Sequence, residues 1–144
     1  MNEDKMIEVL ARVEDEKVRF ERKEKGALGF NMDVWNSLVG ESEGSNICGT
    51  TACLAGHAAV SDGYHLRNST DCAKQDGTYP KWKWTDHKSI EQAGREVLGL
   101  TVDQADDLFY LGNLDDVYLT VAGWMGVDEI VLRDKVQGSR KMVP

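Results

Sequence analysis

Apolar residues recur at helical spacing near the start of the chain. Met6, Leu10 and Val13 lie three and four positions apart, with Ile7 and Val9 flanking them. This pattern predicts a helix from Lys5 to about Glu16. The charged residues that continue to Lys25 indicate a solvated continuation of that helix or its frayed end, before two glycines break it.

A second helix is predicted from about Thr51 to Ser61, with Thr50 or Thr51 as its N-terminal cap. Small side chains recur in it at spacings of three and four. They are Ala52, Ala55, Gly56 and Ala59. Small residues let a neighbouring backbone approach closely, and apolar residues cover much of the remaining surface. We therefore expect a central helix that is buried on most sides.

Two segments favour extended structure. The apolar cluster from Phe30 to Trp35 has no clear helical phase and suggests a short strand or an irregular packing segment. Further along, the pair Asp76-Gly77 is typical of a hairpin turn. Trp82 and Trp84 then alternate with lysines, which is the period of a strand. These features predict a β-hairpin over roughly residues 71–85 that lies over the helices.

Capping residues divide the last third of the chain into four helices. Ser89 with Gln92, and Thr101 with Gln104, fit capping boxes, and Asn113 can cap a third helix. Glycines are expected to end the helices, at Gly99, Gly126 and Gly138. The fourth helix is expected near residues 128–136, and residues 139–144 are expected to form a mobile tail.

These elements predict a mainly α fold (α+β in minor part), a compact helical domain around the buried helix at about 51–61 with one hairpin at about 71–85. The chain has 144 residues, a common size for one domain, so residues 1–138 are expected to form a single globular domain. No run of about 18 apolar residues is present, and the polar, acidic start does not resemble a signal peptide. We therefore expect a cytoplasmic protein whose three cysteines are thiols.

The net charge of −8 narrows the class of partner. A field of that sign repels phosphate backbones and anionic lipids, so neither nucleic acid nor membrane is expected to bind. A basic protein surface would be attracted by this negative charge and is the kind of partner that we expect. No cofactor is expected, because no phosphate loop, dinucleotide fingerprint or nucleophile elbow is present.

Two stretches of the sequence form a motif. Phe30-x-Met32-x-x-Trp35 is followed by Cys48-Gly-Thr-Thr-Ala-Cys53-Leu-Ala-Gly-His57-Ala. Together they resemble a group of small bacterial and bacteriophage proteins with the pattern F-x-M-x-x-W followed by C-G-T-x-x-C-x-A-G-[WH]-A. The resemblance implies an intracellular protein of bacterial or phage origin and no established activity. Many members of the group carry Trp at the position of His57, which argues against essential chemistry there.

Cys48, Cys53 and His57 are the first candidates for chemistry. Cys53 and His57 lie four apart and share a helix face, so both could bind one metal ion, with Cys72 or His65 completing the site. The spacing is not that of a standard zinc module, and burial as small apolar side chains is the favoured interpretation.

A nucleophilic Cys53 is a further possibility. It would lie in the first turn of its helix, where the helix dipole lowers a thiol pKa. His57, His65 or His87 would then act as the base. The apolar surroundings argue against it, because they raise the pKa of a thiol.

The segment from Tyr79 to Trp84 interleaves aromatic and basic residues, with Lys81 and Lys83 beside Trp82 and Trp84. Such a pattern can anchor a protein partner or stack on bases or sugars. The alternation alone favours a half-buried strand whose indoles cover the core while the lysines face water.

The third candidate is an acidic ridge. It comprises Asp103, Asp106, Asp107, Asp115 and Asp116. The helix pair around residues 90–110 is not a DNA-binding helix-turn-helix, because its second helix presents aspartates and no Arg or Lys to phosphate. These carboxylates are typical of solvated faces, which a basic partner could bind.

The sequence favours a non-enzymatic binding protein, phage-encoded and acting on a host protein. Its partner surface would be the Trp82/Trp84 hairpin, the acidic helices, or both. Two alternatives are open: a small enzyme or metal protein using Cys48, Cys53 and His57, and an anti-defence protein that sequesters a ligand or imitates the charge of DNA.

Overall fold

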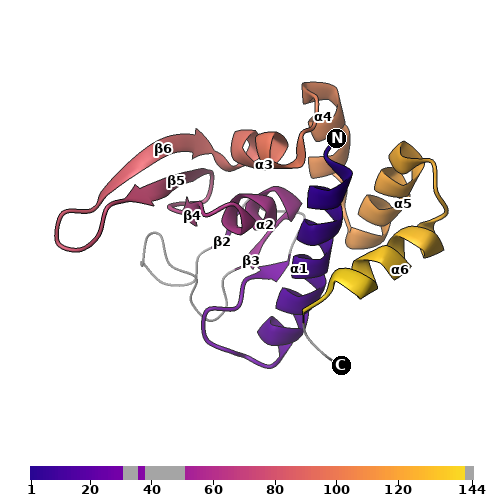
Figure 1. The fold of residues 1–144 in the computed structure, drawn as a ribbon, viewed down its shortest axis with the longest axis horizontal. Helices are drawn as coiled ribbons and strands as arrows, with labels where there is room; N and C mark the ends of the chain where they lie inside the picture. The colour runs from indigo at the N-terminus through magenta and orange to yellow at the C-terminus, as the bar shows by residue number, and fades with distance from the viewer. Residues whose placement is uncertain (31–35, 38–50, 142–144) are drawn as a thin grey trace.

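The computed structural model describes residues 1–30, 36–37 and 51–141, and it confirms the mainly α fold (Figure 1). The helices in this part of the chain are α1 (Glu3–Glu21), α2 (Leu54–Ser61), α3 (Ile90–Leu98), α4 (Val102–Phe109), α5 (Leu114–Met125) and α6 (Glu129–Ser139). The strands are β1 (Gly29–Phe30), β2 (Asn36–Ser37), β3 (Thr51–Ala52), β4 (His65–Leu66), β5 (Asp71–Asp76) and β6 (Lys83–Ser89).

Helix α1 is longer than its apolar pattern predicts. The Asn2 side chain accepts a hydrogen bond from the backbone N–H of Lys5 and so caps the helix before its first apolar residue. Of the two expectations for the charged segment, a solvated continuation of the helix is confirmed, because the segment stays helical to Glu21. An ion pair between Arg19 and Glu16 spans one of its turns. The helix buries Met6, Val9, Leu10 and Val13.

Helix α2 is the buried central helix that the small residues predict. Residues Leu54 to Ala59 are all buried. Its N-terminal cap is Cys53, so the expectation of Thr50 or Thr51 is wrong. Thr51 lies instead in β3, which pairs with β1 in parallel and with β2 antiparallel. Thr50 lies outside the described residues.

Close packing of α2 against α3 depends on Gly94. A methyl group placed on Gly94 would lie 2.7 Å from the Cα and 2.8 Å from the Cβ of Ala55. Atoms in a folded protein do not approach so closely. The small residues of α2 therefore do let a neighbouring backbone approach, and the partner residue is a glycine on α3.

The predicted hairpin is present, and β4 adds a third antiparallel strand to it. The hairpin extends to Ser89 rather than residue 85, and the loop between its strands runs from Gly77 to Trp82. The register contains a bulge: Cys72 pairs with Lys88 and Lys74 pairs with Thr85, so β6 has one extra residue there. Asp86, in this bulge, has a φ of 52°. Because side chains alternate along a strand, the extra residue turns Trp84 to the face opposite Lys88.

The N-terminal caps in the last third are confirmed, but Gln92 does not complete the expected capping box with Ser89, because its side-chain amide donates to Glu96. Ser89 and Asn113 each accept a backbone hydrogen bond, and Thr101 and Gln104 cap each other reciprocally. Helices α3 and α5 end at glycines in the left-handed conformation, Gly99 and Gly126. The expected end of the last helix is wrong, since α6 continues through Gly138 to Ser139.

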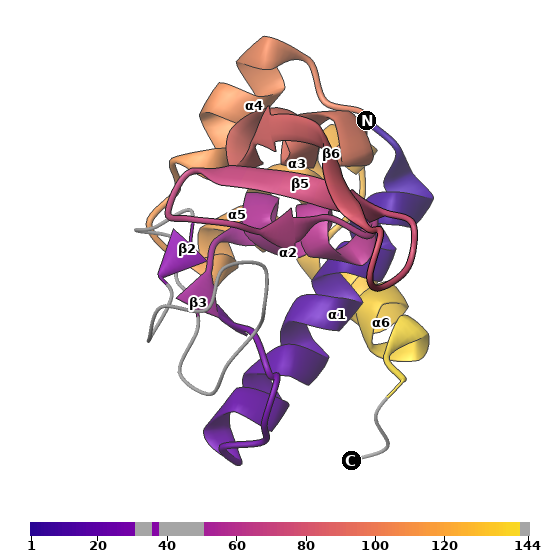
Figure 2. The same ribbon diagram turned by 90° about the vertical axis from the view of Figure 1, so that its left-hand side faces the viewer.

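The N-terminal helix α1 separates two groups of elements in Figure 1, and Figure 2 shows α6 alongside it. Helices α2 and α3 and the β4–β5–β6 sheet extend to one side of it, and α5 and α6 lie on the other. Tyr118 of α5 donates a hydrogen bond to Glu14, and Arg140 forms an ion pair with Asp15. Residues 140–141, predicted to belong to a mobile tail, thus contact α1, and residues 142–144 lie outside the described part.

Candidate functional site

Cys53 and His57 lie one turn apart at the start of α2, and both are buried, with 1% and 0% of their surfaces exposed. The His57 Nε2 lies 2.8 Å from the backbone oxygen of Gly29. A carbonyl can only accept, so Nε2–H is the donor and Nδ1 carries the lone pair. The imidazole thereby links α2 to β1, where the Phe30 ring also contacts it.

Burial makes both groups poor catalysts. It raises the pKa of the Cys53 thiol to about 11, against smaller opposing effects of backbone groups near the helix start. It lowers the pKa of His57 to about 4, assisted by the positive charge of Arg12. At neutral pH the pair is therefore a neutral thiol and a neutral imidazole. A nucleophile needs the thiolate and access to substrate, and Cys53 has neither.

The predicted metal ligands do not converge in the described part of the chain. Cys72 lies in β5, buried, and its thiol donates to the backbone oxygen of Ser89. Burial raises the pKa of Cys72 to about 11. His65 lies in β4 beside Trp84. Among residues 1–30, 36–37 and 51–141, no three His, Cys, Asp or Glu side chains are placed to hold an ion. Cys48 lies outside these residues.

The hairpin carries a row of stacked side chains on one face. The rings of Trp82 and Trp84 meet edge to face with centroids 5.1 Å apart, and His65 meets Trp84 in the same way at 5.5 Å. The Arg67 guanidinium lies 4.6 Å from the centroid of the Trp84 ring. We call these four residues the hairpin strip. His65, in β4, and Arg67, which directly follows β4, enter the strip because β4 lies beside β5, and sequence spacing did not predict this pairing.

The hairpin strip is not part of the hydrophobic core. The core formed by the described residues includes neither Trp82 nor Trp84, so the expectation that the indoles cover the core is wrong for this part of the chain. Trp82 is 37% exposed, and Tyr79 in the adjoining loop is 86% exposed. Lys81 and Lys83 are exposed as predicted. The bulge at Asp86 therefore places Trp84, which is half-buried, on the face of β6 opposite Lys88.

The opposite face of the hairpin anchors it to the body. Lys74 and Lys88 both lie over the ring of Tyr64. Lys74 also pairs with Asp62, and Lys88 with Glu96 of α3. These contacts fix one face of the sheet against α2 and α3, so the hairpin strip is held on a supported element rather than on a loose ribbon.

The predicted acidic residues lie where the sequence suggests, at solvent-exposed positions. Asp103, Asp106 and Asp107 are exposed on α4, and Asp115 and Asp116 are exposed in the first turn of α5. Negative charge at a helix N-terminus is stabilising, which explains part of their distribution. The structure does not gather them in a cleft with an acid–base partner.

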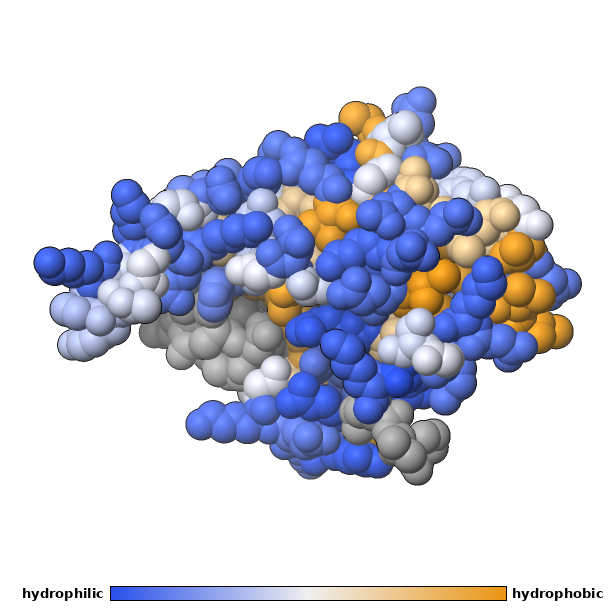
Figure 3. Space-filling view, in the orientation of Figure 1, coloured by the Kyte–Doolittle hydropathy of each residue, from blue (hydrophilic) through white to orange (hydrophobic). Residues whose placement is uncertain are grey.

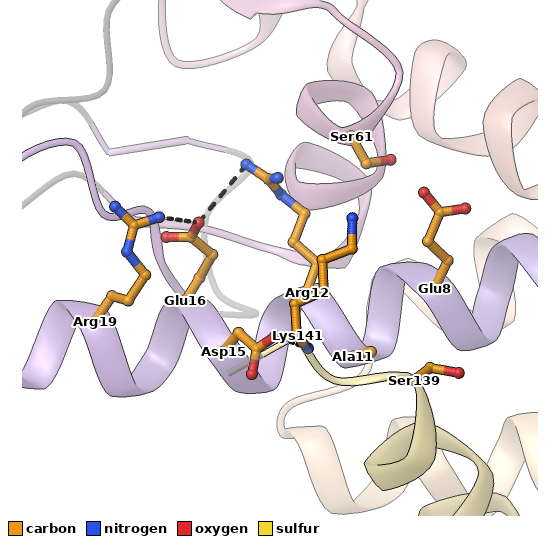
Figure 4. Close-up of a pocket in the computed structure, with 9 residues that line it drawn as sticks. All are labelled: Glu8, Ala11, Arg12, Asp15, Glu16, Arg19, Ser61, Ser139 and Lys141. Carbon is orange, nitrogen blue, oxygen red and sulfur yellow. Dashed lines mark hydrogen bonds and ion pairs between the residues drawn. The ribbon is translucent and has the colours of Figure 1, made fainter. Parts of the chain in front are cut away.

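A groove of about 330 Å³ runs along α1 between the end of α2 and the segment that follows α6 (Figure 4). Its lining is mostly charged, but the charges are used internally. Glu16 lies between Arg12 and Arg19 and accepts a hydrogen bond from the buried N–H of Leu28 at 3.0 Å. Asp15 accepts from the Arg140 side chain and from the Lys141 backbone. This groove is held together by structural ion pairs, and the sequence analysis did not identify it.

Replacing Glu16 with Ala is expected to lower the free energy of unfolding by about 2 kcal/mol, because the buried Leu28 N–H loses its charged acceptor. Urea denaturation followed by circular dichroism measures the effect. The control is Glu21→Ala, at an exposed position in the last turn of the same helix, which should change the free energy by less than about 0.5 kcal/mol. Equal effects of the two substitutions would show that Glu16 has no special structural role.

Comparison of the chain with protein-family models, with curated proteins and with solved structures finds no significant match. In the described residues, no helix combines the length and the apolar content that crossing a bilayer requires.

Proposed function

We propose that this chain is a non-enzymatic protein-binding domain that uses the hairpin strip and Tyr79 as its partner surface. The observation that carries the proposal is the position of Trp82 and Trp84, stacked together outside the core at one end of the molecule. The phage origin and the cytoplasmic host protein as partner belong to the same proposal. They rest on the resemblance of the Phe30–Trp35 and Cys48–His57 motifs.

The chemistry of the strip favours a protein partner. Trp, Tyr and Arg contribute most of the binding energy in protein interfaces, where a rigid aromatic side chain fills a pocket of the partner. Trp84 is held by contacts with His65, Arg67 and Trp82, so little side-chain entropy would be lost on binding. The contacts of Lys74 and Lys88 with the body fix the orientation of the strip.

The positive charge around the hairpin is too small, on a strongly acidic chain, to favour a nucleic acid as the general partner. Residues 64–89 hold five Lys or Arg and three Asp, a net charge of +2, within a chain of net charge −8. Stacking on single-stranded bases works together with a positively charged groove that follows the phosphates. A small basic region on a strongly acidic protein suits an acidic or neutral protein surface better.

The enzyme alternative is less favourable. Two of the residues that it would use, Cys53 and His57, lie in the described part of the chain and are buried. Burial raises the pKa of Cys53 and lowers the pKa of His57, which favours the neutral form of each. Substrate would have to displace Gly29 or Phe30 to reach the imidazole.

The test is affinity capture from bacterial lysate, followed by calorimetric titration of the purified candidate partner. Replacing Trp82 with Ala is expected to weaken binding at least tenfold, which corresponds to about 1.4 kcal/mol and is typical of an interface anchor. The matched control is Val102→Ala, which removes an exposed apolar side chain from α4 and should leave the affinity unchanged.

Two results would refute the proposal. One is the absence of any partner that binds reproducibly. The other is a partner that binds Trp82→Ala as tightly as the unaltered protein. Binding of an oligothymidylate that depends on Trp82 would instead show that the strip stacks on single-stranded nucleic acid.

A further inference from the structure

Most of the net charge of the protein comes from α4, α5 and α6. Residues 101–139 contain eight acidic residues and two basic residues, a net charge of −6 against −8 for the whole chain. Of the two basic residues, Arg133 is already bonded to Asp115 and Glu129, and Lys135 is exposed on α6. The field around these helices is therefore strongly negative, although the rest of the chain is close to neutral.

The same segment also exposes apolar side chains. Of the seven large hydrophobic residues that are exposed in the described part of the chain, five lie between residues 102 and 131. Leu119 of α5 is 54% exposed and Ile130 of α6 is 69% exposed. Figure 3 shows apolar atoms gathered over the α5–α6 hairpin, at the end of the molecule opposite the β5–β6 hairpin.

The placement of Leu119 and Ile130 is inferred from Arg133, which spans the seam between α5 and α6. Arg133 crosses this seam, with its guanidinium bonded to Asp115 and 4.1 Å from the centroid of the Tyr118 ring. Leu119 is one turn beyond Asp115, and Ile130 is three residues before Arg133. Because the turn at Gly126 joins the end of α5 to the start of α6, both displacements lead toward this turn. We call Leu119 and Ile130, together with the half-buried Trp124, Met125 and Val127 around this turn, the seam patch.

Exposed apolar surface with a charged rim is typical of an interaction site. Around the seam patch the rim is acidic, with Asp116, Asp128 and Asp134 exposed on the same two helices. An apolar stripe with basic residues on both sides would complement it. An amphipathic helix rich in Lys and Arg presents that pattern, with apolar residues at positions i, i+3 and i+4.

We propose that the seam patch is a docking site for a basic amphipathic helix of a partner protein. The apolar face of that helix would cover Leu119 and Ile130, and its basic residues would face the carboxylates of α5 and α6. This site is separate from the hairpin strip, carries the opposite charge and does not depend on the function proposed for the strip.

The test uses a synthetic peptide of roughly 14 residues, about four turns of helix, with Leu on one face and Lys on the other. Binding is measured by fluorescence anisotropy, and its position by amide chemical shifts. The double variant Leu119→Ser/Ile130→Ser keeps every charge, and it is expected to bind the peptide at least tenfold more weakly. Val102→Ser, on α4, and Trp82→Ala, in the hairpin, are expected to bind it as the unaltered protein does.

Two further peptides separate docking from attraction between net charges. One has the same composition in an order that forms no apolar face, and the other has Glu in place of each Lys. Both are expected to bind at least tenfold more weakly than the first. Circular dichroism and thermal melts of the variants check that these exposed substitutions leave the fold intact.

The proposal would be overturned if the reordered Lys peptide bound as tightly, if the double variant kept full affinity, or if the amphipathic peptide did not bind. Sedimentation tests for one other occupant of the seam patch, a second copy of this chain. A dimer of this chain that the double variant dissociates would show that a second copy fills the patch, and this would also overturn the proposal.

Discussion

Replacing Gly94 with Ala is expected to lower the free energy of unfolding by about 2 kcal/mol or more. The added methyl group would lie 2.7 Å from the Ala55 Cα, a backbone atom that cannot rotate away, so α2 and α3 must separate. Forcing extra atoms into a packed core costs about 1–3 kcal/mol or more, and it outweighs the gain of up to about 1 kcal/mol in helix propensity. Chemical denaturation gives the free energy, and the melting temperature should fall by several degrees.

The control for Gly94 is another helical glycine. Gly123 lies in α5 with open space where its Cβ would be, so Gly123→Ala should raise stability by about 0.5–1 kcal/mol. The two substitutions are chemically identical, but their effects on the free energy of unfolding should have opposite signs, because only the methyl group at Gly94 would meet Ala55. If Gly94→Ala were also neutral or stabilising, the close approach of α2 and α3 described above would be wrong.

His57 should make the protein less stable as the pH falls from about 6.5 to about 4. The folded state holds the imidazole neutral down to about pH 4, whereas the unfolded chain takes up a proton near the ordinary value of 6.5. Protons therefore bind more readily to the unfolded state in this window, and stability is lost as the pH falls. This difference in the pKa of His57 between the folded and unfolded states corresponds to roughly 3 kcal/mol of stability. That stability is fully present above pH 6.5 and is lost at about pH 4.

The measurement is a series of urea denaturations between pH 7 and pH 4 on the unaltered protein and on His57→Gln. The glutamine amide can donate to the Gly29 oxygen but has no proton to gain, so the variant should show a shallower pH dependence. Carboxylates also titrate in this range, and for that reason the difference between the two proteins is the quantity of interest. His87→Gln, at an exposed position, controls for the loss of a histidine. An identical slope in all three proteins would mean that His57 is not held neutral in the folded state.

Local rules were enough to predict most of the helices. Side-chain caps and left-handed glycines involve residues three or four positions apart, and Ser89, Thr101 and Asn113 behave accordingly. Where a boundary depends on a distant partner, the pattern was misleading. Thr51 has a good capping side chain, but it lies in a strand because β1 and β2 pair with it.

The candidate site was predicted in composition but not in geometry. Alternation places Trp82 and Trp84 on one face of a strand, but it does not say which face. The bulge at Asp86 decides that, and it depends on the register between β5 and β6. The contacts of Trp84 with His65 and Arg67 come from β4 and the residue that follows it, and the two residues of β4 are too few to produce a periodic pattern.

The position of α1 has a consequence for synthesis on the ribosome. Its hydrogen bonds with Tyr118 and Arg140 join residues 104 and 125 positions apart, and α6 packs along it. At translation rates of roughly 5–20 residues per second, α1 would leave the exit tunnel about 5–25 s before those partners. During this interval the nascent helix keeps an apolar face uncovered. We therefore expect folding to finish late, and we expect the emerging chain to be a substrate for holding chaperones such as those that bind exposed apolar segments.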